Sequence, residues 1–222
     1  MDPEIKDRRP IKARQTRWAI TSARWLQQRG ATPNGISVAS VIFALFAALA
    51  FFGALNSEIT ALRILLFVLA ALLVQGRLIC NLLDGMVAVE GGLRSPVGAV
   101  FNDLPDRISD SLILIGVGYG LSGFISWTPE LGWAAALMAV MTAYVRVLGG
   151  TCEQPQKFLG PMAKQHRMAL LTISAVIACF LPPDWSQSLF FIVLWVITLG
   201  ALWTTLRRTS VLMADLRKDN ER

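Results

Sequence analysis

Carboxylate and carboxamide side chains gather at two places in an otherwise apolar sequence. Asn81 and Asp84 are three residues apart, and Asn102, Asp106 and Asp110 follow one another at intervals of four. Each spacing places its residues on one face of a helix. Carboxylate and amide oxygens without histidine or thiolate beside them favour hard cations such as Mg²⁺, Mn²⁺ or Ca²⁺. The two groups therefore predict a site where oxygen ligands hold a divalent cation.

Both groups lie in segments apolar enough for a membrane, where ionisable side chains are costly and usually mark a function. Aspartates near one another also repel, so they need a cation to stay ionised. Two other interpretations stay open: a hydrogen-bond network that only holds helices together, and a pathway for protons or ions. A transporter is expected to show repeats with broken helices in matching halves, and no such repeat is visible.

Six long apolar stretches are the elements that must position these residues. They cover about residues 35–55, 62–89, 96–127, 131–148, 167–181 and 189–206. Most approach the roughly 20 residues that cross a hydrocarbon core. Hydrophobic residues make up 54% of the 222, more than a soluble domain of this length usually contains. We expect an all-α membrane protein whose six-transmembrane-helix bundle covers residues 34–208. A short connection, residues 90–95, makes the polar ends of the second and third stretches face each other.

The N-terminal segment, residues 1–33, has the pattern of a juxtamembrane amphipathic helix. Residues 2–33 contain eight Lys or Arg, and Ile11, Trp18, Trp25 and Leu26 recur at roughly helical spacing. Such a basic amphipathic helix lies on an anionic membrane surface. A solvated helix that packs on the bundle is the other interpretation. The sequence Thr32-Pro33-Asn34-Gly35 is expected to end this helix.

The cations are distributed unevenly among the predicted connections. Nearly all lie in the N-terminal segment, in the 2–3 and 4–5 connections and in the C-terminal tail, residues 209–222. By the positive-inside rule, both termini are cytoplasmic, in a multi-pass protein of the inner (cytoplasmic) membrane. The net charge of +6 then belongs to the cytoplasmic membrane face, and no nucleic acid is needed to explain it. Cys80, Cys152 and Cys179 have neither disulfide nor zinc spacing, so we expect them to be unbridged.

The polar residues also match a longer pattern with fixed gaps. Asn81-Leu-Leu-Asp84-Gly85-Met-Val-Ala88-Val89 is followed by eight residues and then by Gly98-xxx-Asn102-xxx-Asp106. This arrangement resembles the signature of the CDP-alcohol phosphatidyltransferase family, D-x-x-D-G-x-x-A-R, eight residues, G-x-x-x-D-x-x-x-D. Every gap agrees. The six predicted spans and the N-terminal helix resemble the family plan as well, so the resemblance covers most of the chain.

The resemblance implies transfer of a phosphatidyl or related phosphoalcohol group from a CDP-linked donor, such as CDP-diacylglycerol, to an alcohol acceptor. CMP is released, and the reaction belongs to phospholipid biosynthesis. The implied partners are the donor lipid, the acceptor alcohol, membrane lipids and a second copy in a homodimer. The implied cofactor is Mg²⁺ or Mn²⁺, held by Asp84, Asn81, Asn102, Asp106 and Asp110.

Further roles follow by position in the pattern. The resemblance implies Asp106 as the general base, which takes the proton of the acceptor hydroxyl. The residues expected around the nucleotide are Gly85, Ala88, Gly98 and Arg77. Other cations at the cytoplasmic ends of the spans are expected to bind substrate phosphate, namely Arg146, Lys164 and Arg167. His166, the only histidine, is expected at the surface.

Three positions depart from the family pattern. Asn81 and Asn102 stand where the family has aspartates, and Val89 stands where it has arginine. An asparagine offers a neutral oxygen, so two negative charges are missing from the expected metal cage. This favours one tightly bound metal ion over two. A catalytically inactive protein of the same fold that binds lipid or nucleotide is the alternative.

Overall fold

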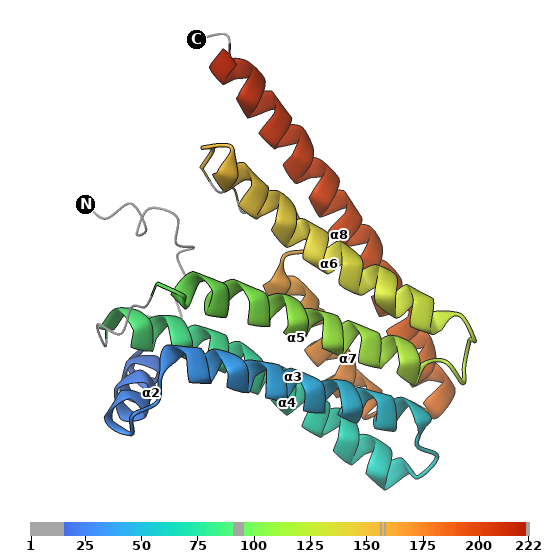
Figure 1. The fold of residues 1–222 in the computed structure, drawn as a ribbon. Helices are drawn as coiled ribbons and strands as arrows, with labels where there is room; N and C mark the ends of the chain where they lie inside the picture. Colours follow the sequence, from blue (N-terminus) through green and yellow to red (C-terminus); the bar gives the residue numbers. More distant parts are fainter. Residues whose placement is uncertain (1–15, 91–95, 156, 158, 221–222) are drawn as a thin grey trace.

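The computed structural model describes residues 16–90, 96–155, 157 and 159–220, and its regular structure there is entirely helical. The helices are α2 (Arg17–Gln28), α3 (Pro33–Asn56), α4 (Thr60–Glu90), α5 (Gly98–Gly120), α6 (Thr128–Thr151), α7 (Lys164–Ala178) and α8 (Pro183–Asn220). Figure 1 shows α3, α4 and α5 running side by side, with α6 and α8 forming a second group that leans away from them. The all-α prediction is confirmed.

Four helices are long and apolar enough to cross a membrane by length and composition. They are Pro33–Asn56, Thr60–Val89, Thr128–Thr151 and Pro183–Asp219. The other two predicted spans differ for physical reasons. In α5 the first half contains Asp103, Asp106, Arg107 and Asp110, and α7 has only 15 residues. The count of six spans therefore stays a prediction.

A break occurs close to the predicted residues 32–35, but it lies at residues 29–32, and Pro33, Asn34 and Gly35 form the first turn of the next helix. Helix α2 ends at Gln28 and α3 begins at Pro33. The Thr32 side chain caps α3, because its Oγ1 accepts a hydrogen bond from the Gly35 N–H at 3.1 Å. Pro33 stands at the first helical position, where its missing N–H costs nothing. These two residues fix the point at which the chain enters the bundle.

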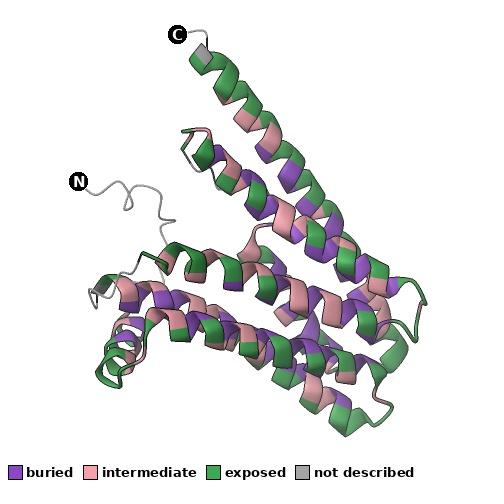
Figure 2. Ribbon diagram, in the orientation of Figure 1, coloured by how far each residue is buried: buried purple, intermediate pink, exposed green. Residues whose placement is uncertain are grey.

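Helix α3 organises the bundle, because it packs against both α4 and α5, whereas α4 and α5 make few direct contacts. Helix α5 packs on α6, α6 on α8, and α4 on α7. The core includes stacked and edge-on rings, with Phe190 5.4 Å from Phe51 and 5.5 Å from Phe67 between ring centroids. Figure 2 places buried residues between the helices and exposed ones on their outer faces.

Large apolar side chains cover the outside of the bundle as well as its core. Along α3, for example, Ile42, Phe46 and Leu49 are each more than half exposed. A soluble monomer rarely exposes an apolar surface this extensive. The outer faces of the helices therefore have the chemistry of a surface that contacts lipid.

Helix α2 packs on the bundle through small residues. Ala19 and Ala23 are buried in a cluster that includes Leu82 and Met86 of α4. Trp18 and Trp25, which the sequence placed on the apolar face, are 48% and 51% exposed. The helix therefore has two apolar sides, one against α4 and one uncovered. Contact of the tryptophans with a membrane surface stays a prediction, and Ile11 lies outside the described residues.

The last helix is longer than its predicted span. Helix α8 begins at Pro183 and continues to Asn220 without a break, although the sequence predicted a span over residues 189–206 and a separate tail. The polar residues after position 206 are compatible with a helix that has left the apolar layer. Figure 1 shows this end of α8 extending beyond the other helices.

Candidate functional site

The polar ends of α4 and α5 meet through their side chains. Arg77 of α4 donates from Nη2 to the carboxylates of two α5 residues, at 2.6 Å to Asp110 Oδ1 and 3.3 Å to Asp106 Oδ1. One helical turn farther along α4, Asn81 donates from Nδ2 to Asp106 Oδ1. The long side chains thus bridge helices that otherwise make few contacts. The structure brings together Arg77, Asn81, Asp106 and Asp110.

Asp110 is held between two arginines. Its Oδ1 accepts from Arg77, and its Oδ2 accepts from Arg167 Nη2 at 2.6 Å. All three side chains are at most 2% exposed. Arg167 is also bound to the Met162 carbonyl at 2.8 Å. Because both oxygens of Asp110 point to guanidinium groups, this residue ties α4, α5 and α7 together.

Asp106 lies nearer the surface and contacts three donors. Lys164, the first residue of α7, donates from Nζ to Oδ2, while Arg77 and Asn81 occupy Oδ1. The Asp106 side chain is 14% exposed and that of Lys164 26%. Unlike Asp110, this carboxylate is therefore open to a ligand from outside the bundle.

Asp84 is buried beside the start of α3. The Ser37 hydroxyl donates to its Oδ2 at 2.7 Å, and the Gly85 N–H donates to Oδ1. Its carboxylate interacts electrostatically with Asp106 and Lys164. Ser37 could not be recognised from the sequence, because a residue 47 positions away carries no spacing signal that links it to Asp84.

The remaining aspartate of α5, Asp103, joins this helix to α6. Asp103 Oδ1 accepts hydrogen bonds from Arg107 Nη2 and Arg146 Nη2, both at 2.8 Å. Asp103 is 38% exposed, so this cluster lies at the rim of the site. Of the remaining predicted residues, Gly85, Ala88 and Gly98 are partly buried, and Asn102 is exposed one turn before Asp106. His166 is exposed, as expected.

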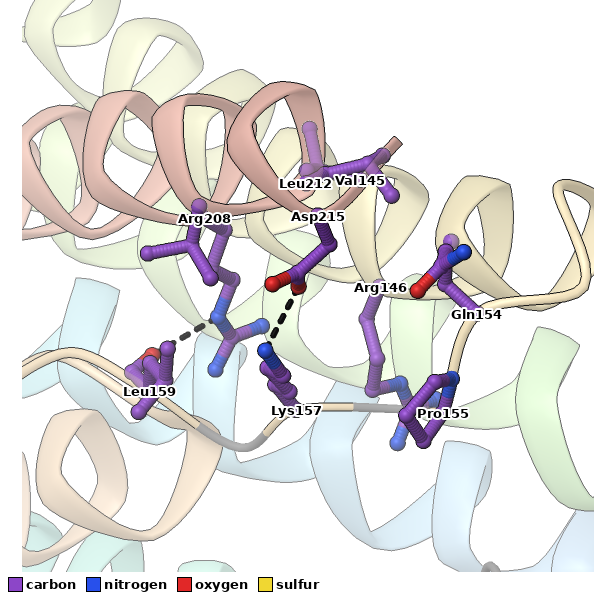
Figure 3. Close-up of a pocket in the computed structure, with 11 residues that line it drawn as sticks. Val145, Arg146, Gln154, Pro155, Lys157, Leu159, Arg208, Leu212 and Asp215 are labelled. Atoms are coloured by element: carbon purple, nitrogen blue, oxygen red, sulfur yellow. Dashed lines mark hydrogen bonds and ion pairs between the residues drawn. The ribbon is translucent and has the colours of Figure 1, made fainter. Parts of the chain in front are cut away.

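Arg146 also lines a small pocket between α6, α8 and the segment that precedes α7 (Figure 3). Lys157 and Asp215 form an ion pair there at 2.5 Å, and Arg208 donates from Nε to the Leu159 carbonyl at 2.7 Å. The free volume is about 30 Å³, roughly that of one water molecule. Lys157 and Arg208 were missed by the sequence analysis. Arg208 lies just beyond the last predicted span, where a flanking arginine is ordinary.

The site as a whole has a small positive charge. Five cations, Arg77, Arg107, Arg146, Lys164 and Arg167, meet four carboxylates, Asp84, Asp103, Asp106 and Asp110. Buried Arg77 also keeps two donor nitrogens, Nε and Nη1, without a hydrogen-bond partner among the described residues. A site with surplus donors and surplus positive charge suits an anionic ligand.

The donor set suits one divalent ion better than two. Asp84 and Asp106 supply carboxylates, and Asn81 and Asn102 can add only neutral oxygens. Both oxygens of Asp110 are taken by arginines. Within the part of the chain that is described, no group of three or more His, Cys, Asp or Glu side chains could hold a metal. With two carboxylates and at most two amide oxygens, the residues present do not fit a paired metal cage.

Known proteins resemble this chain in sequence and in structure. No family model matches the sequence. The inner membrane protein YnbA of Escherichia coli is 26% identical over 189 residues, which cover 83% of this chain and 85% of that protein. With the four apolar helices, this likeness identifies the chain as a membrane protein.

Solved structures of other proteins show which known fold this chain has. Phosphatidylinositol phosphate synthase (PgsA1) of Mycobacterium tuberculosis with CDP-DAG bound superimposes with a TM-score of 0.72 and 19% identity, over 89% of this chain and 94% of that one. The chain has the PgsA1 fold. The same enzyme in complex with manganese and citrate also gives 0.72, over 88% of each chain. At the level of the fold, the resemblance to the CDP-alcohol phosphatidyltransferases is confirmed.

In the PgsA1 fold of this chain, the polar pattern falls at one end of the bundle. The second half of α4, the first half of α5 and the start of α7 supply the side chains described above. The fold therefore explains why residues 77–84, 103–110 and 164–167 meet, although the sequence separates them widely.

Proposed function

We propose that this protein transfers a phosphatidyl or related phosphoalcohol group from a CDP-linked donor to an alcohol acceptor, with release of CMP. The observation that carries the proposal is the partly open Asp106 carboxylate, which lies among Lys164, Arg77 and Asn81 in a chain of the PgsA1 fold. Cations around a carboxylate provide both a phosphate site and a proton acceptor.

In the proposed reaction, the acceptor oxygen forms a bond to the lipid-side phosphorus of the diphosphate. The phosphoanhydride bond breaks, and CMP leaves with the electron pair. The hydroxyl proton passes to Oδ2 of Asp106, which keeps a lone-pair direction beyond its contact with Lys164, whereas Oδ1 already accepts from Arg77 and Asn81. Lys164 and Arg146 supply positive charge near the diphosphate, and Gly85, Ala88 and Gly98 surround the nucleotide. The buried side chains of Arg77 and Arg167 hold Asp110 instead of contacting the substrate.

One divalent cation, Mg²⁺ or Mn²⁺, is part of the proposal. Asp84, Asp106, Asn81 and Asn102 would hold it, and it would neutralise charge on the diphosphate and on departing CMP. We assign Asp110 to bracing Arg77 and Arg167, because both of its oxygens are already bound. Manganese in a PgsA1 structure supports a divalent ion in this fold.

The membrane arrangement follows from the same proposal. We place the site at the cytoplasmic boundary, with six spans, both termini cytoplasmic and two chains in a homodimer. A lipid-tailed donor can then stay in its leaflet while the soluble nucleotide leaves.

A protein that binds the donor without reacting is the second candidate. It is favoured by the three donors that hold Asp106 and by the two aspartates that Asn81 and Asn102 replace. This candidate differs from the first in turnover alone, so a turnover measurement separates the two.

The test is exchange of labelled CMP into CDP-diacylglycerol by the purified chain in detergent with Mg²⁺ or Mn²⁺ and a panel of alcohol acceptors, because a direct displacement returns labelled CMP to the donor only when the transfer runs in reverse. We expect exchange from the wild type. Asp84→Asn and Asp106→Asn should each reduce it by about 100-fold or more, as expected for a group that acts in the transition state. Asp184→Asn, an exposed carboxylate at the start of α8, is the matched control. Nucleotide binding without exchange by the wild type would favour the binding protein.

A further inference from the structure

We propose that the ammonium of Lys164 replaces one of the two divalent ions for which the family pattern provides ligands. This inference rests on the proposed function and adds a description of how the site is charged. The chain would then bind one divalent ion, and the Lys164 ammonium would take the place of the other.

The first argument is charge balance. The family pattern has four aspartates at positions 81, 84, 102 and 106, and this chain keeps two of them. The two missing negative charges equal the charge of one divalent ion. The site already has one surplus positive charge, so two divalent ions would raise the surplus to five and one ion would raise it to three, and charge at membrane depth is costly.

The second argument is the position of the ammonium. Lys164 Nζ binds Asp106 Oδ2 directly. A cation in direct contact with the open carboxylate of the cluster occupies the kind of position that a metal ion takes when a site is built from aspartates.

The third argument is the orientation of Asn81. Its amide nitrogen donates to Asp106 Oδ1, so the two side chains attract each other without a metal between them. An aspartate at position 81 would place a second carboxylate against Asp106, and the repulsion would demand a cation there. The asparagine removes this demand, which is consistent with the lysine serving as the second cation.

The start of α7 is also held firmly enough to present the ammonium at a fixed place. Three residues beyond Lys164, Arg167 is fully buried and bound to Asp110 and to the Met162 carbonyl. The Met162 N–H in turn donates to Thr204 Oγ1 of α8 at 3.1 Å. A lysine on a braced helix start is therefore less mobile than a lysine on a surface loop.

The test counts ions rather than turnovers. Mn²⁺ binding to the full-length protein in detergent is followed by electron paramagnetic resonance of free Mn²⁺, without lipid or nucleotide. The wild type should bind one ion per chain. The triple variant Asn81→Asp, Asn102→Asp and Lys164→Met should bind two, and Gln165→Glu, which adds a carboxylate at an exposed neighbouring position, should still bind one.

Lys164→Met should tighten Mn²⁺ binding by about tenfold or more, because removal of a neighbouring positive charge leaves Asp106 free to act as a ligand. Lys218→Met, at an exposed position near the end of α8, should leave the affinity unchanged. Two ions per wild-type chain, no ion at all, or an unchanged affinity in Lys164→Met would overturn the inference.

The wild-type count stands even where a variant fails to fold. Because the measurement contains no substrate, a protein without exchange activity can still show one ion and support the lysine's role. An active enzyme with two ions would instead uphold the proposed function and overturn this inference.

Discussion

At the scale of single residues, two aspartates one helical turn apart have different surroundings. Asp110 is fully buried with a guanidinium on each oxygen, whereas Asp106 is partly exposed and contacts an ammonium, a guanidinium and an amide. Burial decides which carboxylate can meet a substrate. The sequence shows only that both lie on the same helical face, so it could not assign the bracing role to one and the reactive role to the other.

We expect Asp110→Asn to destabilise the fold by roughly 3–5 kcal/mol, because it leaves two buried guanidinium groups facing a neutral amide. Asp103→Asn, which removes a more exposed partner of Arg107 and Arg146, should cost about 0–1 kcal/mol. Unfolding in detergent, followed by circular dichroism, compares the two. If Asp110→Asn left stability intact and abolished Mn²⁺ binding, Asp110 would be a metal ligand and not a brace.

At the scale of helices, much of the architecture could be predicted from residue types. Apolar stretches located the helices α3 to α8, and Thr32 with Pro33 marked the start of α3. The ends were less predictable. Helix α5 stops at Gly120, seven residues before the end predicted for the third span. Helix α8 continues 14 residues past the end predicted for the sixth span. Hydropathy describes the apolar layer, while hydrogen bonding lets a helix continue beyond it.

The partners of the cations could not be predicted, because they depend on how helices pack. Arg167 and Arg146 lie at helix ends where positive charge is ordinary, and only their tertiary positions bring them to Asp110 and Asp103. Likewise, no local pattern predicts that the Ser37 hydroxyl donates a hydrogen bond to the Asp84 carboxylate. The sequence could identify which residues have chemistry, but pairing is a property of the packed bundle.

The segment before α7 illustrates a position where the backbone itself is constrained. Gly160 has φ of +104°, a conformation that residues with a side chain rarely adopt, and a Cβ there would overlap the Thr204 side chain. We expect Gly160→Ala to destabilise the fold by about 1–3 kcal/mol. It should also reduce CMP exchange by about tenfold, because Lys164 follows four residues later.

Gly123→Ala is the control for this substitution. Its Cβ would lie 3.7 Å from Asn56 Oδ1, an ordinary contact at the opposite end of the bundle. Thermal unfolding and CMP exchange should both stay at the wild-type level. Equal losses in the two variants would mean that glycine at position 160 has no special relation to the site.

At the scale of the whole molecule, the charged half of α5 is what makes a six-span arrangement reasonable. Its aspartates are all paired with cations from α4, α5, α6 or α7. Paired charges that face the bundle interior are tolerated at membrane depth. Helix α7 is about 23 Å long at 1.5 Å per residue, shorter than a core of about 30 Å. Beyond its end, Phe180 is 85% exposed, so apolar surface continues past the helix.

Single cysteines in a background without Cys80, Cys152 and Cys179 test this arrangement. Glu58→Cys, Ser122→Cys and Asp184→Cys lie at exposed positions in the α3–α4 and α5–α6 connections and at the start of α8. We expect a membrane-impermeant maleimide to label them in spheroplasts. Lys218→Cys, exposed near the other end of α8, should be labelled only in inside-out vesicles.

Ser122→Cys, in the α5–α6 connection, is the variant that tests whether α5 crosses the membrane. If the paired charges allow α5 to cross, residue 122 lies on the outer side together with residues 58 and 184. If the charges keep α5 out of the apolar layer, residue 122 is labelled from the cytoplasmic side instead, and the six-span arrangement is wrong. Labelling of residues 58 and 218 from the same side would contradict the topology that the positive-inside rule predicts.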